Sequence, residues 1–109
     1  MIVNVGYGRG AELAGRLEDS NIICNYQAAP DEEGFTASGA LRLGVAEMTR
    51  FGMGPADFAE VAALMAAVLN DGAAVSADVA ALRARFTDLR YCFEGPDFDP
   101  LLQRLHELI

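Results

Sequence analysis

Hydrophobic and polar positions in the first part of the chain predict two strands separated by a helix. Residues 2–7 and 22–27 are short, largely apolar stretches of strand length. Between them, residues 11–19 carry two leucines and an alanine at the spacing of one helix face. Two such strands can run parallel through a right-handed crossover or belong to a split, antiparallel arrangement, and the spacing leaves both topologies open.

In residues 45–72, apolar side chains recur at helical spacing. Residues 45–51 predict a short helical turn. Residues 55–69 predict a long helix that starts at a proline and stops at the Asn-Asp-Gly of residues 70–72. We expect its inward face to comprise Phe58, Val61, Ala62, Met65, Val68 and Leu69.

Two more helices are predicted in the last third. The first has Ser76 as its N-cap, and the second starts at residues 99–100, an Asp-Pro pair. His106 falls off the apolar stripe of the second helix and is therefore expected at the surface. The first helix is expected to bury Val79, Leu82, Phe86 and Leu89, and the stripe of the second comprises Leu101, Leu102, Leu105, Leu108 and Ile109.

The stretch at residues 38–44 combines a third predicted strand with the strongest candidate for ligand binding. Leu41 and Leu43 alternate with Arg42, so the leucines share one face and the arginine takes the other. A guanidinium held between core-facing leucines suits a carboxylate or a phosphate, because its donors form a planar fork. The alternative is an ordinary surface arginine on an edge strand.

Together these elements predict one α+β domain over residues 1–109. We expect a two-layer sandwich, in which a small sheet of two or three strands has helices packed on one face. The longest apolar run, residues 61–69, is too short to span a bilayer, so no membrane contact is expected. No basic leader precedes the first strand, which favours the cytoplasm, and a start inside a strand suggests part of a longer protein.

The charged residues of the chain limit which partners and which reactions are expected. Eight basic residues oppose 16 acidic ones, giving a net charge of −8, which disfavours nucleic acid as a partner. Every basic residue is an arginine. Chemistry that needs a Schiff base to a lysine amine therefore cannot be completed within this sequence.

Metal binding and disulfide formation are not expected. Cys24 and Cys92 lie far apart without a CxxC spacing, and with His106 they make too few ligands for a zinc site. We expect two reduced thiols, at least one of them buried in a strand. The acidic run at residues 31–33 fits a solvated loop better than a cation site.

A glycine-rich turn follows the first predicted strand. Gly6, Gly8 and Ala11 match the pattern G-x-G-x-x-A of dinucleotide-binding turns. The second strand ends in Asn-Tyr-Gln at residues 25–27, without the acidic residue that binds a ribose. A simple strand-to-helix turn is therefore the preferred interpretation.

Three segments, taken in order, resemble a known family. They are Asn-Ile-Ile-Cys-Asn at residues 21–25, Ser-Gly-Ala-Leu-Arg-Leu-Gly at 38–44, and Glu-Met-Thr-Arg-Phe-Gly-Met at 47–53. Their order and separation are similar to those in the C-terminal small domain of serine hydroxymethyltransferase, a pyridoxal-phosphate enzyme. The resemblance is strongest over residues 1–72, which leaves residues 73–109 as a C-terminal helical extension.

The resemblance implies a role for three residues. Arg42 would bind the carboxylate of serine or glycine, with Ser38 beside it in the same motif, and Gln27 stands where the family has an asparagine on the folate side. It also implies that pyridoxal phosphate, its lysine and the catalytic residues belong to a large domain of the same polypeptide. This chain alone would then neither hold the cofactor tightly nor catalyse the transfer of a one-carbon unit to tetrahydrofolate. A homodimer is the expected assembly.

Departures from the family pattern keep other functions open. Ala40 is an extra residue or replaces a glycine with a one-residue shift, Arg50 and Phe51 occupy positions where threonine and arginine are common, and Gln27 replaces the asparagine. A folate-independent aldolase acting on β-hydroxy amino acids is one alternative. A stand-alone module that binds a small molecule is another, and a domain that mainly supplies an interface, and self-associates without its partner, is a third.

Overall fold

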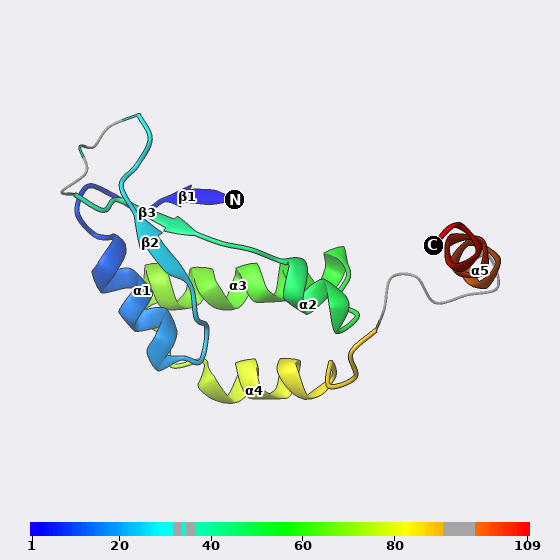
Figure 1. The fold of residues 1–109 in the computed structure, drawn as a ribbon. Coiled ribbons are helices and arrows are strands. Elements are labelled where there is room, and N and C mark those ends of the chain that lie inside the picture. Colours follow the sequence, from blue (N-terminus) through cyan, green and yellow to red (C-terminus); the bar gives the residue numbers. More distant parts are fainter. Residues whose placement is uncertain (32–33, 35–36, 91–97) are drawn as a thin grey trace.

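The computed structural model describes residues 1–31, 34, 37–90 and 98–109. In Figure 1 the helices α1 and α3 lie against one side of a small sheet, α4 runs alongside α3, and α5 stands apart from the body. The elements in chain order are β1 (Ile2–Asn4), α1 (Gly10–Asp19), β2 (Asn25–Gln27), β3 (Ala40–Arg42), α2 (Ala46–Arg50), α3 (Pro55–Asp71), α4 (Ser76–Ala84) and α5 (Phe98–Leu108).

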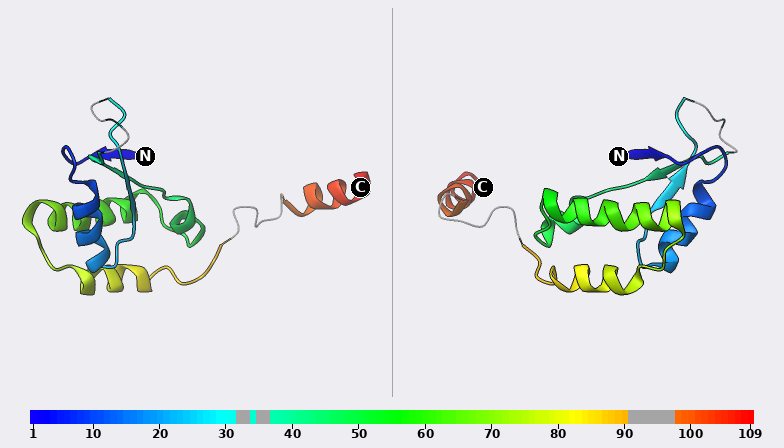
Figure 2. Two further views of the ribbon diagram at one scale, coloured as in Figure 1. Left: turned by 60° about the vertical axis from the view of Figure 1, so that its left-hand side comes forward. Right: turned by 180° about the vertical axis from the view of Figure 1, so that it is seen from behind.

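The sheet has the order β1-β3-β2, and β3 pairs antiparallel with both neighbours. Since both edge strands oppose β3, β1 and β2 run in the same direction with β3 between them. The two strands are thus parallel, as in the first of the two topologies that the spacing left open, but they are split by β3, as in the second. Figure 2 shows α1 and α3 on one side of the sheet from two further directions. The predicted α+β sandwich is therefore confirmed.

The strands are shorter than predicted, for local reasons. β1 ends at Asn4 because Gly6 and Gly8 adopt positive φ angles of 108° and 69° and turn the chain into α1. Of the strand predicted over residues 22–27, only the last half pairs in the sheet. Asn21 adopts a φ of 64°, and the N–H of Ile22 donates to the carbonyl of Leu17, so the chain first folds back on the end of α1.

The core lies between the sheet and helices α1 and α3. Leu17 of α1 and Leu41 of β3 are fully buried and are the largest such side chains. Burying a leucine contributes about 2–3 kcal/mol each, so this pair anchors α1 to the middle strand. The buried cluster comprises Ala14, Leu17, Leu41, Val68 and Val75.

The long helix α3 has the predicted boundaries. It begins at Pro55, where a missing N–H costs little, and the N–H of Gly54 donates to Oδ2 of Asp57 at 2.8 Å. Gly72, in the left-handed conformation, follows its end. Its predicted inward face is only partly covered, since Val68 is buried whereas Ala62 is exposed, contrary to expectation.

Helix α4 differs from the prediction at both ends. Ser76 is its first helical residue, and Val75 occupies the cap without a side-chain hydrogen bond, so the predicted Ser76 cap is wrong. Leu82 is buried as expected, but the helix ends at Ala84 and Leu89 beyond it is 42% exposed. The prediction that Leu89 is buried was wrong, because it extended the amphipathic spacing beyond the end of the helix.

An ion-pair network joins α4 to α3. The Arg85 guanidinium contacts Oδ1 of Asp57 at 2.7 Å and Oε2 of Glu60 at 2.9 Å. The hydrogen bond to Glu60 is the largest cause that raises the pKa of Arg85 above its ordinary value; burial opposes it, and the charge of Glu60 and then the hydrogen bond and charge of Asp57 raise it further. Since Arg85 and Glu60 are about half exposed, the network contributes little to stability.

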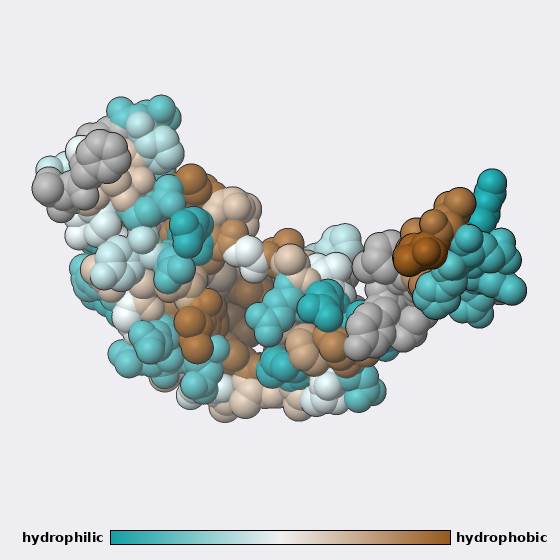
Figure 3. Space-filling model, in the orientation of Figure 1, coloured by the Kyte–Doolittle hydropathy of each residue, from teal (hydrophilic) through white to brown (hydrophobic). Residues whose placement is uncertain are grey.

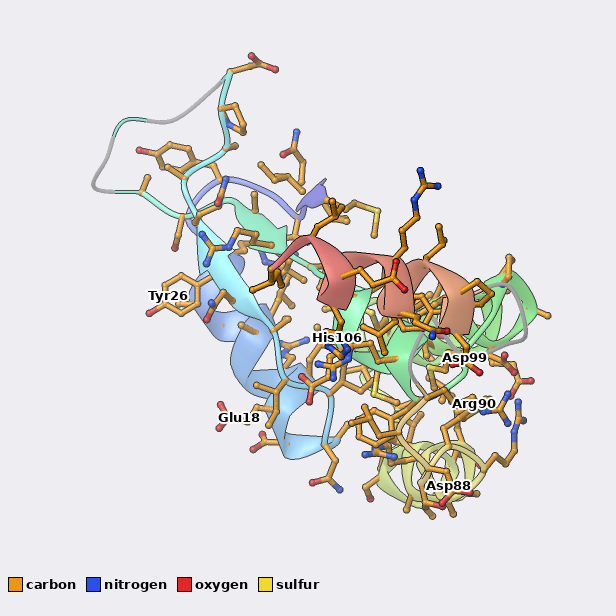
Figure 4. The ribbon with its side chains drawn as sticks, turned by 45° about the vertical axis from the view of Figure 1, so that its right-hand side comes forward. Glu18, Tyr26, Asp88, Arg90, Asp99 and His106 are labelled. Carbon is orange, nitrogen blue, oxygen red and sulfur yellow. The ribbon has the colours of Figure 1, made fainter. Side chains whose placement is uncertain are left out.

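Helix α5 forms where its stripe predicts, and the stripe is uncovered. His106 is exposed as expected and lies on α5 in Figure 4. In Figure 3 the hydrophobic side of α5 shows as a separate brown patch away from the body. Two predicted features, the Cys92 thiol and most of the acidic run at 31–33, lie outside the described residues. The exposed stripe comprises Leu101 (62%), Leu102 (38%), Leu105 (52%), Leu108 (81%) and Ile109 (94%).

Candidate functional site on the open face of the sheet

Arg42 lies on the side of the sheet that the helices do not cover. Leu41, its neighbour in β3, points into the core and is fully buried. Successive side chains of a strand point to opposite faces, so Arg42 points away from α1 and α3, and its side chain is exposed. The predicted division between leucine and arginine faces is confirmed for this pair. Leu43 lies just beyond β3, is half-buried, and donates its N–H to the Met1 carbonyl at 2.9 Å.

The pairing register brings residues from all three strands to this open face. Arg42 is paired with Ile2 of β1 on one side and with Asn25 of β2 on the other. One step along the same face, Ala40 is paired with Asn4 and Gln27. Ile2 is 44% exposed, Gln27 is half-buried and Ala40 is fully buried. The open face is thus Ile2, Asn4, Asn25, Gln27 and Arg42, with the buried Ala40 between Asn4 and Gln27.

Arg42 is the only charged residue on the open face. Its side chain forms no hydrogen bond or ion pair with any described residue, and its neighbours across the sheet are one isoleucine and one asparagine. An unpaired guanidinium amid neutral groups is available for an incoming anion. Elsewhere in the described chain, ion pairs join Glu12 to Arg9 and Arg16, and Arg85 to Asp57 and Glu60.

Ser38 lies two residues before β3 rather than beside Arg42. It is half-buried, and its carbonyl accepts a hydrogen bond of 2.6 Å from the N–H of Gly10. Three residues separate Ser38 from Arg42, so their Cα atoms lie up to about 13 Å apart in an extended chain. The backbone of Ser38 thus positions the start of α1, and contact of its hydroxyl with substrate stays a prediction.

The fold brings Gln27 close to Arg42. Two residues that the sequence did not single out, Asn25 and Ile2, lie closer still. Gln27 is diagonal to Arg42 across β2 and β3, which corresponds to about 7–8 Å between Cα atoms. Asn25 and Ile2 lie directly opposite Arg42. Their even spacing from Gln27 and Asn4 is visible in the sequence, but their place beside Arg42 depends on the register between strands.

The cleft found among the described residues does not include the open face. This cleft, of about 410 Å³, lies elsewhere, between α3 and α4, and is lined by residues including Leu64, Leu82 and Arg85. Tyr26, on the other face of β2, projects from the edge of the sheet in Figure 4 and is 54% exposed. A small ligand at Arg42 would therefore need a second protein surface to enclose it.

Comparison with known proteins finds serine hydroxymethyltransferases from several archaea that are similar to this chain. The serine hydroxymethyltransferase of Pyrobaculum arsenaticum is 41% identical over 90 residues, which cover 81% of this chain and 21% of that enzyme. Those of Korarchaeum cryptofilum and Methanopyrus kandleri are 39% and 37% identical, over 84% and 79% of this chain and 23% and 21% of theirs. This chain belongs to the serine hydroxymethyltransferase family. No family model and no solved structure matches it.

The chain spans about a fifth of the length of these serine hydroxymethyltransferases. This coverage fits the small C-terminal domain that the three sequence segments indicated. No helix of the described residues has the length and hydropathy needed to cross a membrane.

Groups that could hold a metal are absent from the described part of this serine hydroxymethyltransferase domain. Cys24 lies one residue before β2 and is half-buried, so the expectation of a thiol buried within a strand is only partly met. Burial raises the pKa of the Cys24 thiol above its ordinary value of 9.0. The neutral thiol is therefore favoured, and Cys24 packs as a small apolar residue beside the core.

We predict slow thiol labelling of Cys24 in the folded chain. In a Cys92→Ser background, a disulfide reagent at pH 8 should modify Cys24 several-fold more slowly than it does in urea, because the folded thiol is less ionised and less accessible. The raised pKa stabilises the fold fully below about pH 9, and this contribution is lost as the pH rises through the folded value. Equal labelling rates with and without urea would show that Cys24 is not shielded.

Proposed function

We propose that this chain is the substrate-binding small domain of a pyridoxal-phosphate-dependent serine or glycine hydroxymethyltransferase, with Arg42 as the residue that binds the amino-acid carboxylate. The observation that supports it most is the unpaired Arg42 on an open face without acidic residues, in a chain with a net charge of −8. The other members of that face would shape the site: Ile2 excludes water on one side, and Asn25 offers a neutral amide on the other.

Arg42 suits a carboxylate for a geometric reason. Its planar guanidinium donates two parallel hydrogen bonds to the two oxygens of one carboxylate. Each charge-assisted bond contributes about 1.5–3 kcal/mol when both groups are shielded from water. Its position on the middle strand, flanked by β1 and β2, restricts the stem of the side chain. A carboxylate bound there would have a fixed orientation relative to whatever covers the open face.

The residues of this chain do not fit pyridoxal phosphate. The cofactor is held covalently through a lysine amine, and the eight basic residues here are all arginines. The cofactor and the groups that act on it therefore belong, in this proposal, to a large domain of the same polypeptide. That domain is also the proposed partner that encloses Arg42.

Tetrahydrofolate is the proposed one-carbon acceptor, with Gln27 as a contact on its side of the site. Gln27 shares the open face with Arg42 and is half-buried, so its amide is held in place rather than extended into solvent. A glutamine amide offers the same donor and acceptor atoms as the asparagine that it replaces, one methylene farther from the backbone. The longer reach makes Gln27 suited to a ligand shifted slightly outward from the sheet.

The surroundings of the site also support a larger assembly. Ile2 and Val3 of the edge strand β1 are 44% and 36% exposed, and Ile23 is 85% exposed. Apolar groups in such positions favour contact with another protein surface. We propose that the large domain covers part of this surface and that the complete enzyme is a cytoplasmic homodimer.

A chimeric enzyme tests the proposed function. In it, this chain replaces the matching fifth of the Pyrobaculum arsenaticum serine hydroxymethyltransferase. We expect the chimera to convert serine to glycine in the presence of tetrahydrofolate, whereas the same enzyme truncated before this segment should be inactive. A folded chimera with bound pyridoxal phosphate but without serine turnover would reject the proposal.

Two controls separate the alternatives. Turnover of a β-hydroxy amino acid at full rate without folate, together with no serine turnover, would favour the folate-independent aldolase. Calorimetric titration of the isolated chain with glycine and serine should give no binding, because half of the site is missing. Clear binding by the isolated chain would instead favour a stand-alone amino-acid-binding module.

A further inference from the structure

Helix α5 carries an apolar face that is largely exposed to water. In Figures 1 and 2 the helix lies away from α3 and α4, and Figure 3 shows its hydrophobic side as a patch of its own. The five aliphatic side chains of its stripe are between 38% and 94% exposed. An isolated helix of 11 residues is marginal in water without packing. The stripe therefore favours contact with another surface.

The polar side of α5 suits a protein surface better than a membrane. Helices that lie on membranes carry mainly lysine and arginine beside their apolar face. The polar residues of α5 include one arginine, Arg104, and the two acids Asp99 and Glu107 offset its charge. The chain as a whole has a net charge of −8, which anionic lipid repels. A groove on a protein is therefore the better match for the stripe.

The cleft between α3 and α4 is a groove of the kind that accepts an amphipathic helix. It has a volume of about 410 Å³, and the two helices run alongside each other in Figure 1. Its apolar lining comprises the buried Leu82, the half-buried Leu64, and the exposed Ala63 and Ala81. Small side chains at the rim let a third helix approach closely, while the leucines of that helix fill the space between α3 and α4.

The charges beside the cleft and beside the stripe are complementary. Arg85 at one end of the cleft is already engaged by two carboxylates of α3. Asp78, two helical turns earlier on α4, lines the cleft and forms no ion pair with a described residue. Arg104 of α5 likewise forms no such ion pair, and it borders the stripe one turn from both Leu101 and Leu108. An acid in the cleft without an ion-pair partner thus matches a base beside the stripe.

We propose that α5 of one copy of this chain docks in the α3–α4 cleft of a second copy, with Arg104 facing Asp78 across the contact. Each copy has both the helix and the cleft, so exchange in both directions closes a two-fold symmetric dimer. The connection between α4 and α5, residues 85–97, reaches at most roughly 43 Å. This contact does not depend on the role proposed for Arg42.

The exchanged helices would bury enough surface for a stable dimer. An aliphatic side chain that is buried removes about 60–100 Å² of apolar surface from water. Each helix contributes five such side chains, and each cleft loses a similar area beneath them. Two helices and two clefts together fall within the roughly 1,200–2,000 Å² that specific protein interfaces bury.

Sedimentation equilibrium of the 109-residue chain tests the contact. We expect a monomer–dimer equilibrium over protein concentrations of about 1 μM to 1 mM. Leu105→Gln should weaken dimerisation about 100-fold, because Leu105 lies in the middle of the stripe and enters each dimer twice. Since Leu105 is 52% exposed in the single chain, circular dichroism should show that this variant is still folded.

Matched substitutions on α4 separate the cleft from the surface around it. Ala81 lines the cleft and its neighbour Ala80 does not, although both are exposed. Ala81→Glu should weaken dimerisation about 100-fold by placing a charge among the leucines, whereas Ala80→Glu should leave it unchanged. Ile23→Gln removes an 85% exposed side chain near the sheet and should also leave the dimer intact.

A charge exchange tests the pairing of Arg104 with Asp78. Asp78→Arg and Arg104→Asp should each weaken dimerisation about tenfold, because each places like charges together at both contacts. The double variant should restore the affinity to within about threefold of the parent. A double variant weaker than either single one would contradict the pairing.

The position of the contact is open to direct refutation. A chain that stays monomeric at every concentration, or equal effects of Ala80→Glu and Ala81→Glu, would overturn the proposal. A dimer lost in Ile23→Gln but not in Leu105→Gln would place the contact at the sheet. A monomer in which Leu105→Gln shifts the amide signal of Ala81 would place α5 in the cleft of its own chain and reject a second copy as its occupant.

Discussion

Arg42→Lys in the chimeric enzyme is expected to raise the KM for serine about 100-fold, with a much smaller change in kcat. Lysine keeps the positive charge but presents a point charge in place of a planar fork, so one of two charge-assisted hydrogen bonds is lost. A loss of about 2.7 kcal/mol in carboxylate binding corresponds to the 100-fold change. Steady-state kinetics over a serine titration measure both constants, and an absorbance spectrum checks that pyridoxal phosphate is still bound.

Two further substitutions sharpen this test. Arg16→Lys makes the same chemical change on α1, where Arg16 pairs with Glu12, and should leave KM unaltered. Asn25→Asp places a carboxylate directly opposite Arg42, where it competes with the substrate, and should also raise KM. If the chimera is active and Arg42→Lys leaves KM unchanged, Arg42 is not the carboxylate-binding residue, although the family function stands.

The sequence was most informative where structure is determined locally. Helix α3 has a proline at its start, a glycine after its end and an apolar period between them, and its predicted start and stop were correct. The opposite orientation of Leu41 and Arg42 followed from alternation within three residues. These features depend on neighbours in the chain, so they can be inferred without knowing how the chain folds.

Features that depend on contacts between residues far apart in the chain were harder to predict from the sequence. The strand predicted at residues 22–27 is shortened to Asn25–Gln27, because the chain at residues 21–22 first folds back on the end of α1. The placement of Asn25 and Ile2 beside Arg42 depends on the register of three strands separated by a helix and a long loop. A one-residue slip would have exchanged them for Tyr26 and Val3. The members of the candidate site other than Arg42 and Gln27 could therefore be identified only from the structure.

Gly10, the first residue of α1, has both a local role in the sequence and a contact with a distant part of the chain. In the sequence it is one of several glycines in a turn. In the structure its N–H donates to the Ser38 carbonyl at 2.6 Å, and the backbone on both sides of the strand entry leaves no room for a side chain. A Cβ atom at this position would lie 2.8 Å from the Ser38 oxygen and 3.0 Å from the Ala40 oxygen. The contact holds α1 against the strand that carries Arg42.

Gly10→Ala is therefore expected to destabilise the chain by about 2–4 kcal/mol. The new methyl group would meet backbone carbonyls, which cannot move aside without displacing β3, and the hydrogen bond to Ser38 would lengthen. Urea unfolding followed by circular dichroism measures the change. In the chimera the same substitution should also raise the KM for serine, since a shift of β3 moves Arg42.

Gly15→Ala is the matched control within the same helix. A Cβ atom there would meet nothing within 4 Å, and alanine favours the helix over glycine by about 0.5–1 kcal/mol, so this variant should be more stable than the parent. Opposite signs for the two glycine substitutions would show that α1 is docked on β3 through Gly10. If Gly10→Ala is as stable as Gly15→Ala, the close approach at Ser38 and Ala40 does not exist, and the rigid support inferred for Arg42 is lost with it.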